Sequence, residues 1–324
     1  MKKIAVYTSG GDSPGMNACI RAVVRTGIYH NLEVYGIKYG YNGIINGNIK
    51  KMQSHSVSNI LQRGGTILKS ARSNEFRTKE SRQKAYEQLT KHGIEGLVAI
   101  GGDGTFTGAK VFYEEFGIPV VGCPGTIDND IYGTDYTIGF DTAVNTALEA
   151  IDKIRDTAAA HDRVFFVEVM GRDSGYIAIE CAIGGGAEVV MIPETNTTIS
   201  EVSAFLKNLR KTKTSSIVVV AEGDEEGGAA SIMEKVKTEF IGDEKKFKVT
   251  TLGHIQRGGS PTAKDRLLGS RSGLAAVEGL INGKYNCMAG IINDQVVYTP
   301  FEDCINKTKP LNKDYFKLQE ILSI

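Results

Sequence analysis

The chain has 324 residues, and its 38 lysines and arginines balance its 38 aspartates and glutamates, so the formal net charge is zero. A balanced charge excludes a general electrostatic attraction to nucleic acid, and we expect no nucleic-acid partner. Hydrophobic residues make up 41% of the sequence, and glycine occurs 38 times. This composition and length predict an α/β protein with many tight turns and enough core for two lobes.

Short apolar runs alternate with segments of helical periodicity along the chain. Met16, Ile20 and Val23 share one face of a predicted helix, and Ser200 is the predicted N-cap of a later one. Several runs are apolar throughout, as strands covered on both faces require. The alternation predicts an α/β fold of two doubly wound, mainly parallel-sheet lobes with right-handed crossovers. The predicted strands cover residues 3–8, 33–38, 96–100, 119–123, 163–169, 188–192, 216–222, 247–252 and 289–292.

Two of these predicted strands end in glycine turns. Residues 3–8 lead into GGDSPG at 10–15, and residues 96–100 lead into GGDGT at 101–105. Without a Cβ between main chain and ligand, backbone N–H groups can close on an anion. Asp103 could then hold a divalent cation against that anion. Because ligands of doubly wound sheets bind outside the carboxyl ends of strands, the two turns predict one polyphosphate held from two sides.

The segment PGTIDND at 124–130 follows the predicted strand 119–123. Asp128 and Asp130 are two residues apart, and on an extended chain they would point to the same side. Two close carboxylates oppose each other's ionisation, which raises one pKa and gives a better proton acceptor. An Asx-rich turn and a calcium loop are the alternatives, but a calcium loop needs a glutamate about a dozen positions on, and none is there.

Several cationic side chains could reach phosphate. Arg172 lies between glycines at a strand end, where the alternative is a surface ion pair. His254 and Arg257 are three positions apart and could both donate to a dianion, although a lone histidine is more often structural. Arg21 and Arg25, one helical turn apart, form either a basic patch or a solvated face.

The absence of several known motifs excludes some classes of reaction. The sequence has no GxxxxGK[ST] phosphate loop, no correctly spaced GxGxxG fingerprint, no nucleophile elbow and no cysteine and histidine cluster for zinc. Two glycine turns, one metal-type aspartate, a paired carboxylate and several cations favour phosphoryl transfer, where catalysis is mostly positioning and charge neutralisation.

Taken together, the segments GGDSPGMN, GGDGT, PGTIDND, VEVMGR and LGHIQRGGSP closely resemble ATP-dependent 6-phosphofructokinases of the bacterial type, over nearly the whole chain and in the same order. The resemblance implies phosphorylation of the 1-hydroxyl of fructose 6-phosphate by MgATP in glycolysis. It also implies a homotetramer whose active sites are shared between subunits. Residues 1–138 with about 251–305 would form the ATP-binding lobe, and about 139–250 with 306–324 the sugar-phosphate lobe.

By this resemblance, Asp128 is the general base for the sugar hydroxyl, and Asp103 holds Mg²⁺ with ATP. Asp130 lies close to the reacting groups, and Thr126 and Arg172 contact the transferring phosphoryl group or the sugar phosphate. The residues that match the ATP site are Gly11, Arg72, Ser73, Gly102, Asp103, Gly104 and Thr105. The residues that match the sugar-phosphate site are Thr126, Ile127, Asp128, Arg163, Met170, Gly171, Arg172, Glu222, Lys248, His254 and Arg257.

The resemblance also bears on the phosphoryl donor. Pyrophosphate-dependent relatives typically carry Asp where this chain has Gly104, and Lys where it has Gly125. ATP is therefore favoured over pyrophosphate or another donor on the same fold. The other alternative is a catalytically dead nucleotide-binding subunit, which should have lost Asp128, Asp103 or Arg172, and all three are present.

Two departures from the family pattern stand out. In this family, Arg163 and a second arginine reach the 6-phosphate from the neighbouring subunit, and Lys248 stands in the place of that second arginine. Ser54 and Asn59 replace an arginine and an aspartate of the effector pocket for ADP or phosphoenolpyruvate, so we expect muted regulation. The residues that match this pocket or its replaced positions are Arg21, Arg25, Ser54, Asn59, Arg155, Gly186, Glu188, Lys211 and Lys213.

The sequence carries no signal for secretion or membrane insertion. The apolar run at 4–7 is followed by Thr8 and Ser9 and is too short for a signal peptide. No stretch approaches the roughly 18 apolar residues of a membrane-spanning helix. The five cysteines lie far apart without a Cys-x-x-Cys pair, which is typical of free thiols in a reducing cytosol. We therefore expect a cytoplasmic protein without a membrane partner.

Overall fold

The computed structural model describes residues 1–209, 213, 215–240 and 246–323. The chain folds into two compact units, each with its own sheet. Unit 1 comprises Met1–Thr142 and Arg257–Lys309, and unit 2 comprises Ala143–Gln256 and Pro310–Ile324. Each unit is therefore built from two separate parts of the sequence. Within the described ranges, no helix is both long and apolar enough to cross a membrane.

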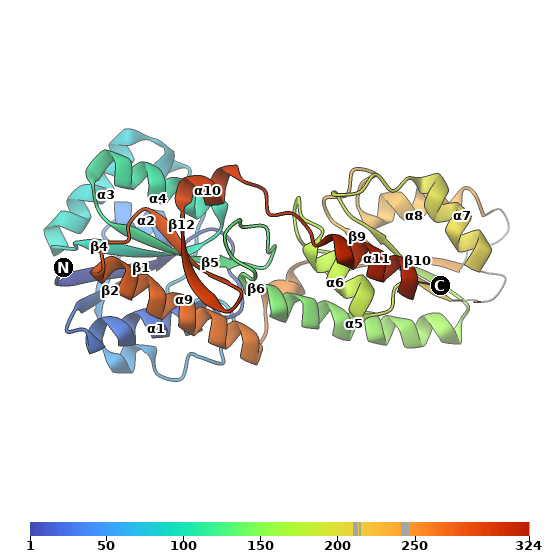
Figure 1. The fold of residues 1–324 in the computed structure, drawn as a ribbon, viewed down its shortest axis with the longest axis horizontal. Coiled ribbons are helices and arrows are strands. Elements are labelled where there is room, and N and C mark those ends of the chain that lie inside the picture. Colours follow the sequence, from blue (N-terminus) through green and yellow to red (C-terminus); the bar gives the residue numbers. More distant parts are fainter. Residues whose placement is uncertain (210–212, 214, 241–245, 324) are drawn as a thin grey trace. The chain divides into compact units, whose positions relative to one another are not determined.

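Unit 1 contains a sheet of eight strands (Figure 1). Their order is β12-β11-β5-β4-β1-β2-β3, and β6 pairs with the end of β5. The inner strands run parallel, whereas β3 and β12 are antiparallel to their neighbours β2 and β11. The strands are β1 (Lys3–Thr8), β2 (Glu33–Ile37), β3 (Ile49–Met52), β4 (Gly96–Gly101), β5 (Val120–Thr126), β6 (Ile138–Gly139), β11 (Cys287–Ile292) and β12 (Gln295–Pro300).

Strand β1 shows why the centre of this sheet is covered on both faces. Its residues Ile4 and Val6 belong to one apolar cluster, Ala5 and Tyr7 belong to another, and all four are fully buried. Successive side chains of a strand point to opposite faces, so a continuous apolar run needs helices on both sides. The first cluster includes residues of α1 (Met16–Tyr29) and α9 (Ala263–Ile281), and the second includes residues of α2 (Gly40–Ile45), α3 (Lys79–His92), α4 (Asp103–Phe116) and α10 (Phe301–Asn306).

The strand order of unit 1 reverses at β1. The chain passes from β1 to β2 on one side and later places β4 on the other side of β1. In open α/β sheets, such a reversal leaves a crevice outside the carboxyl ends of the two strands, and ligands bind there. The glycine turns at 10–15 and 101–105 follow these carboxyl ends. The topology therefore brings together the two turns that the sequence singles out.

Unit 2 contains a parallel sheet, and the described strands have the order β10-β7-β9-β8. Val202 and Leu206 of α7 and Ile232 of α8 share an apolar cluster with Phe166 and Val218 of the sheet. Of the other helices, α6 contacts β8 and β9, and α11 packs on α6. The elements are β7 (Val164–Val169), β8 (Val189–Met191), β9 (Ser216–Ala221), β10 (Phe247–Thr251), α6 (Tyr176–Gly184), α7 (Ile199–Leu209), α8 (Ala229–Lys237) and α11 (Lys313–Leu322), together with α5 (Phe140–Ala160), whose first three residues belong to unit 1.

Three strands of unit 1 are not among the predicted ones. β3 and β12 are edge strands with most residues exposed or half-buried, and β6 has two residues. Such strands lack the continuous apolar run on which the prediction rested. In addition, β5 extends to Thr126, so the residues 124–126 belong to the strand rather than to a turn after it. The mainly parallel architecture is nevertheless confirmed.

The predicted N-cap at Ser200 is wrong. α7 begins at Ile199, and Thr198 Oγ1 accepts a hydrogen bond from the Glu201 N–H at 3.3 Å. In return, Glu201 Oε2 accepts hydrogen bonds from the N–H and the hydroxyl of Thr198, both at 2.8 Å. This reciprocal arrangement is a capping box, and it begins the helix ahead of the predicted position.

Candidate active site

Direct hydrogen bonds join the turns after β1 and β4. The N–H of Ser9 donates to the carbonyl oxygen of Ile100 at 3.0 Å, and Thr105 Oγ1 donates to the carbonyl oxygen of Ser9 at 3.2 Å. A Cβ on Gly101 would lie 2.6 Å from that Ser9 oxygen. Glycine at 101 is therefore what lets the two turns approach this closely.

A third segment, residues 70–73, closes on the first glycine turn. Ser70 Oγ donates to the carbonyl oxygen of Gly10 at 2.6 Å, and the Gly10 N–H donates to the carbonyl oxygen of Ala71 at 3.5 Å. Arg72 and Ser73 follow directly, and Ser73 Oγ accepts a hydrogen bond from a backbone N–H at 3.2 Å. The structure thus gathers the residues predicted for the ATP site around the ends of β1 and β4.

α4 begins at Asp103, so Asp103, Gly104 and Thr105 form its first turn. The first N–H groups of a helix carry the positive end of the helix dipole, which favours an anion. In this turn the Thr105 N–H donates to the carbonyl oxygen of Gly102 at 3.0 Å. An added Cβ on Gly104 would meet no atom within 4 Å, so there is open space beside this helix start. Asp103 is exposed, and Thr105 is buried.

Two buried tyrosines hold the start of α4. Tyr41 Oη donates to the carbonyl oxygen of Thr105 at 2.5 Å, and Tyr7 Oη donates to Tyr41 Oη at 3.0 Å. Burial raises the pKa of both phenols, so both remain proton donors. The sequence pattern gave no signal for Tyr41, whose partner is 64 positions away, and only a weak one for the segment 70–73, because the partner of Ser70 is 60 positions away.

Arg257 lies against the first glycine turn. Its Nη1 donates to the carbonyl oxygen of Asp12 at 3.2 Å, and a Cβ on Gly11 would lie 2.5 Å from the same nitrogen. Gly11 therefore leaves room for the guanidinium. Arg257 belongs to unit 1, whereas His254, three positions earlier, belongs to unit 2 and is exposed. Whether both donate to one dianion stays a prediction.

The carboxylates at 128 and 130 do not share one side of an extended chain. Asn129, which lies between them, has a φ of +54°, in the left-handed region. The alternation argument applies only to extended backbone, so the predicted geometry is wrong at this turn. Asp128 is 4% exposed, and its N–H donates to Thr126 Oγ1 at 3.2 Å. Ile127 is fully buried and anchors the turn in the core.

In unit 2, the ends of β7 and β9 form a second polar turn. Glu222 follows β9, and its Oε1 accepts hydrogen bonds from the N–H groups of Gly171 at 3.3 Å and Arg172 at 2.8 Å. Gln256 Oε1 accepts the N–H of Met170 at 2.9 Å. One oxygen of Glu222 thus positions the turn that carries Arg172, a function that the sequence pattern did not reveal.

Arg163 and Lys248 lie at the opposite end of the same sheet. Arg163 directly precedes β7, and Lys248 is the second residue of β10, paired in register with Phe165. β7 has six residues, and at about 3.3 Å per residue its two ends are roughly 20 Å apart. The structure does not bring Arg163 and Lys248 together with Met170 and Glu222.

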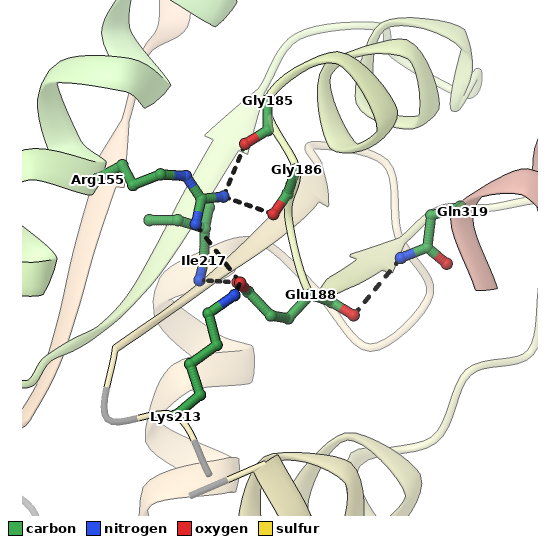
Figure 2. A network of polar contacts seen from close by, with 7 residues as sticks. All are labelled: Arg155, Gly185, Gly186, Glu188, Lys213, Ile217 and Gln319. Carbon is green, nitrogen blue, oxygen red and sulfur yellow. Dashed lines mark hydrogen bonds and ion pairs between the residues drawn. The ribbon is translucent and has the colours of Figure 1, made fainter. Parts of the chain in front are cut away.

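A cluster of ion pairs in unit 2 unites most of the predicted effector residues of this unit (Figure 2). Glu188 Oε1 lies 3.4 Å from Arg155 Nη1 and also accepts a hydrogen bond from Lys213 Nζ. Arg155 Nη2 donates to the carbonyl oxygens of Gly185 at 2.7 Å and Gly186 at 2.6 Å. Glu188 Oε2 accepts the N–H of Ile217 at 2.6 Å. The predicted residue Lys211 lies outside the described residues.

The other predicted effector residues belong to unit 1. Arg21 and Arg25 are on α1, and partial desolvation together with the neighbouring Arg25 charge lowers the pKa of Arg21. Ser54 begins a short 3-10 helix, η1 (Ser54–Val57), and Asn59 has a φ of +56°. The two arginines are therefore close enough to act as one positive patch.

Asp103 is the residue whose position fits a metal ion. Mg²⁺ in phosphate sites is held by one or two carboxylates together with phosphate oxygens and water, rather than by a cage of protein ligands. Among the described residues, no group of three or more His, Cys, Asp or Glu could hold a metal ion. An exposed carboxylate in the first turn of α4 fits a metal that arrives with its anion.

Comparison with known proteins gives matches over the whole length of the chain. Residues 3–280 match the protein family described as Phosphofructokinase. A Cytophaga hutchinsonii protein named ATP-dependent 6-phosphofructokinase is 63% identical over 324 residues, which cover 100% of this chain and 98% of the relative. A Thermus thermophilus protein named ATP-dependent 6-phosphofructokinase 1 is 56% identical over 325 residues and is covered completely, as is this chain.

Solved structures show the same fold. Phosphofructokinase from Saccharomyces cerevisiae is similar with a TM-score of 0.89 and 36% identity over 100% of this chain. Pichia pastoris phosphofructokinase in the T-state is similar with a TM-score of 0.87 and 35% identity over 94% of this chain. The chain spans 48% and 35% of those two longer chains, respectively.

Proposed function

We propose that this chain, which belongs to the phosphofructokinase family, transfers the terminal phosphoryl group of ATP to the 1-hydroxyl of fructose 6-phosphate. The products are fructose 1,6-bisphosphate and ADP, and the reaction is a step of glycolysis in the cytoplasm. One observation carries the proposal: the turns after β1 and β4 meet where the strand order reverses. That arrangement offers the backbone donors that a polyphosphate needs.

Unit 1 supplies the nucleotide contacts in this proposal. The N–H groups of Gly102 and Gly104 at the start of α4 would bind the phosphates of ATP, and Gly11 lines the neighbouring turn. Thr105 belongs to the same helix turn, where its own N–H donates to the carbonyl oxygen of Gly102 at 3.0 Å. Arg72 adds a positive charge from the segment that closes on Gly10. Asp103 would hold Mg²⁺, which supplies neutralisation of the charge on the transferring phosphoryl group.

Asp128 is the proposed general base. Its side chain is nearly excluded from water, which strengthens its interaction with a hydroxyl group. In the reaction, the carboxylate accepts the proton of the sugar 1-hydroxyl while the oxygen attacks the terminal phosphorus of ATP and ADP leaves. A positioned base contributes about 10²–10⁴-fold to the rate. Thr126, Asp130 and Arg172 are proposed to contact the phosphoryl group during this step.

Most of the residues proposed to contact the sugar phosphate belong to unit 2, among them His254. Arg257, the second proposed donor to the 6-phosphate, belongs to unit 1. Met170, Gly171 and Glu222 lie at the carboxyl ends of β7 and β9. Arg163 and Lys248 lie at the amino ends, roughly 20 Å away along six-residue strands, and cannot serve the same bound sugar phosphate. This separation supports the proposal that they serve the site of a second copy, as in a homotetramer with shared active sites.

We also propose an effector site for ADP or phosphoenolpyruvate, as the resemblance to the family implies. Its unit 2 part is the ion-pair cluster of Arg155, Glu188 and Lys213, and its unit 1 part is the Arg21 and Arg25 patch. We propose that each of these two groups contributes to the binding of an anionic effector.

The proposal is tested with the purified full-length chain. Formation of fructose 1,6-bisphosphate from fructose 6-phosphate is measured with MgATP and, separately, with magnesium pyrophosphate. We expect turnover with ATP and none with pyrophosphate. Turnover with pyrophosphate alone would contradict the donor, and turnover with neither would contradict the function. Light scattering during size exclusion measures the assembly, for which we expect four chains.

A further inference from the structure

The catalytic turn is fixed by its middle residue. Asn129 is 1% exposed and adopts a φ of +54°. Asparagine is one of the few residues other than glycine that adopts this left-handed conformation readily, because its short polar side chain can bond locally. Since Asp128 and Asp130 project from the same backbone turn, the conformation of Asn129 decides where both carboxylates lie.

The amide of Asn129 has two partners from different segments. Its Oδ1 accepts the N–H of Thr137 at 3.0 Å and a hydrogen bond from Lys309 Nζ at 2.9 Å. The Thr137 bond is buried. A charged donor makes the stronger of these two kinds of hydrogen bond. The side chain of Asn129 is thus held from outside the turn by the Lys309 ammonium.

Lys309 reaches this turn from the segment that follows α10. Thr308 forms an isolated antiparallel bridge with Ile131, and Lys309 Nζ also donates to the carbonyl oxygen of Asp135 at 2.7 Å. Ile131 is 1% exposed, so the bridge is anchored in the core. The segment 308–309 therefore fastens both the beginning and the end of the loop 129–137. Lys309 is also the last residue of unit 1 before the chain enters unit 2.

We propose that Asn129 and Lys309 form a brace that positions Asp128 for proton transfer. The inference rests on the proposed function, and it concerns positioning residues that do not themselves touch the substrates. The Lys309 ammonium can donate to two acceptors at once. One of them is the Asn129 side chain, and holding that side chain in place fixes the backbone conformation of the turn. A displacement of a catalytic group by about 1 Å lowers the rate by roughly 10²-fold.

The test measures kcat, the KM values for ATP and fructose 6-phosphate, and the unfolding midpoint. Lys309→Met removes the donor, Lys309→Arg restores a positive donor, and Asn129→Gly removes the amide while allowing positive φ. Lys51→Met is the matched control, because Lys51 makes an exposed ion pair with Glu33 at 2.9 Å in the same unit. The double variant Asn129→Gly with Lys309→Met completes a mutant cycle.

We expect Lys309→Met to lower kcat about 10- to 100-fold with the KM for ATP within about three-fold of the parent. Lys309→Arg should recover most of the rate, Lys51→Met should match the parent, and the double variant should be no slower than Asn129→Gly. The brace would be overturned by an unchanged kcat in Lys309→Met, or by a loss of kcat that Lys309→Arg does not recover. It would also be overturned if the two substitutions had independent effects in the mutant cycle, or if the Lys309→Met chain were unfolded at the assay temperature. The parent enzyme's own turnover tests the proposed function separately, and a parent without turnover would overturn both.

Discussion

The Glu188 carboxylate lies 3.4 Å from the Arg155 guanidinium, and its side chain is 1% exposed. The same oxygen accepts a hydrogen bond from Lys213, so one buried carboxylate pairs with both cations of the proposed effector site in unit 2 and offsets one of their two positive charges (Figure 2). An incoming anion must compete with this carboxylate. The pairing adds to the effect expected from Ser54, which contributes no positive charge in unit 1.

We therefore predict a shallow response to phosphoenolpyruvate. The fructose 6-phosphate concentration for half-maximal rate should shift less than about three-fold when phosphoenolpyruvate is added, which corresponds to a weak coupling free energy. The Ser54→Arg variant should show a larger shift, because it adds a guanidinium for the anion. Rate curves with and without phosphoenolpyruvate measure both. A strongly sigmoidal shift in the parent chain would contradict the prediction.

Replacing the proposed base tests its assignment. Asp128→Asn keeps the shape of the side chain but cannot accept the hydroxyl proton, so kcat should fall about 10²–10⁴-fold. Binding of MgATP, measured by calorimetry, should be unchanged, because the nucleotide contacts come from the turns after β1 and β4. If turnover survived in this variant, another group would have to be the base.

Donor choice is predicted to depend on the open space beside Gly104. A Cβ added there would meet no atom within 4 Å, so we expect Gly104→Asp to fold like the parent. Its carboxylate should lower kcat/KM for ATP about 10- to 100-fold, because a like charge beside the phosphates is repelled. Gly104→Ala is the control and should stay close to the parent. A charged variant with full ATP activity would show that the space is not used by the nucleotide.

Lys248 is predicted to limit the affinity for fructose 6-phosphate. Lysine presents a point charge, whereas arginine presents a fork that matches two phosphate oxygens. Lys248→Arg should therefore tighten the apparent affinity by about 1–2 kcal/mol, and Lys248→Gln should weaken it. Saturation curves for fructose 6-phosphate give both values. An unchanged or weaker affinity in the arginine variant would refute the expectation.

A buried carboxylate makes the stability of unit 1 depend on pH. Asp265 is fully buried, and it accepts hydrogen bonds from the Gly139 N–H at 2.8 Å and from the N–H and hydroxyl of Thr142 at 2.8 and 2.5 Å. Burial raises the pKa of this carboxyl above its ordinary value of 3.8. The folded state thus binds the proton more tightly than the unfolded state, and stability from this group falls as pH rises from about 4 through the raised pKa.

Asp265→Asn should remove that pH dependence. The amide cannot accept all three hydrogen bonds, so the variant should be less stable by about 1–3 kcal/mol. Only the parent loses stability as its carboxyl ionises. The difference in unfolding free energy between the parent and Asp265→Asn should therefore narrow between pH 4 and pH 7. Urea unfolding at several pH values measures this difference. A difference that widens with rising pH would contradict the sign.

Local patterns determined much of this protein from the sequence. Fully apolar runs such as residues 96–100 become buried strands because a strand covered on both faces buries its side chains on both sides, which favours apolar residues throughout. Glycine turns such as 101–105 predict ligand sites, because glycine lets the backbone approach an anion closely. By contrast, the edge strand β12 was not predicted, because an exposed strand needs no apolar run. The cap of α7 was misplaced because Thr198 and Glu201 stabilise its start reciprocally.

The tertiary structure alone decided which distant residues meet. The glycine motifs predicted that the turns at 10–15 and 101–105 lie at one site, but not the hydrogen bond between Thr105 and Ser9. The bond of Lys309 to Asn129 across 180 positions has no signal in the neighbouring residues. The left-handed conformation of Asn129 means that the backbone between Asp128 and Asp130 is not extended, so the predicted alternation does not apply there. Sequence periodicity reports only what each residue faces locally. Contacts between remote segments depend on strand order and crossover, which the whole chain settles when it packs.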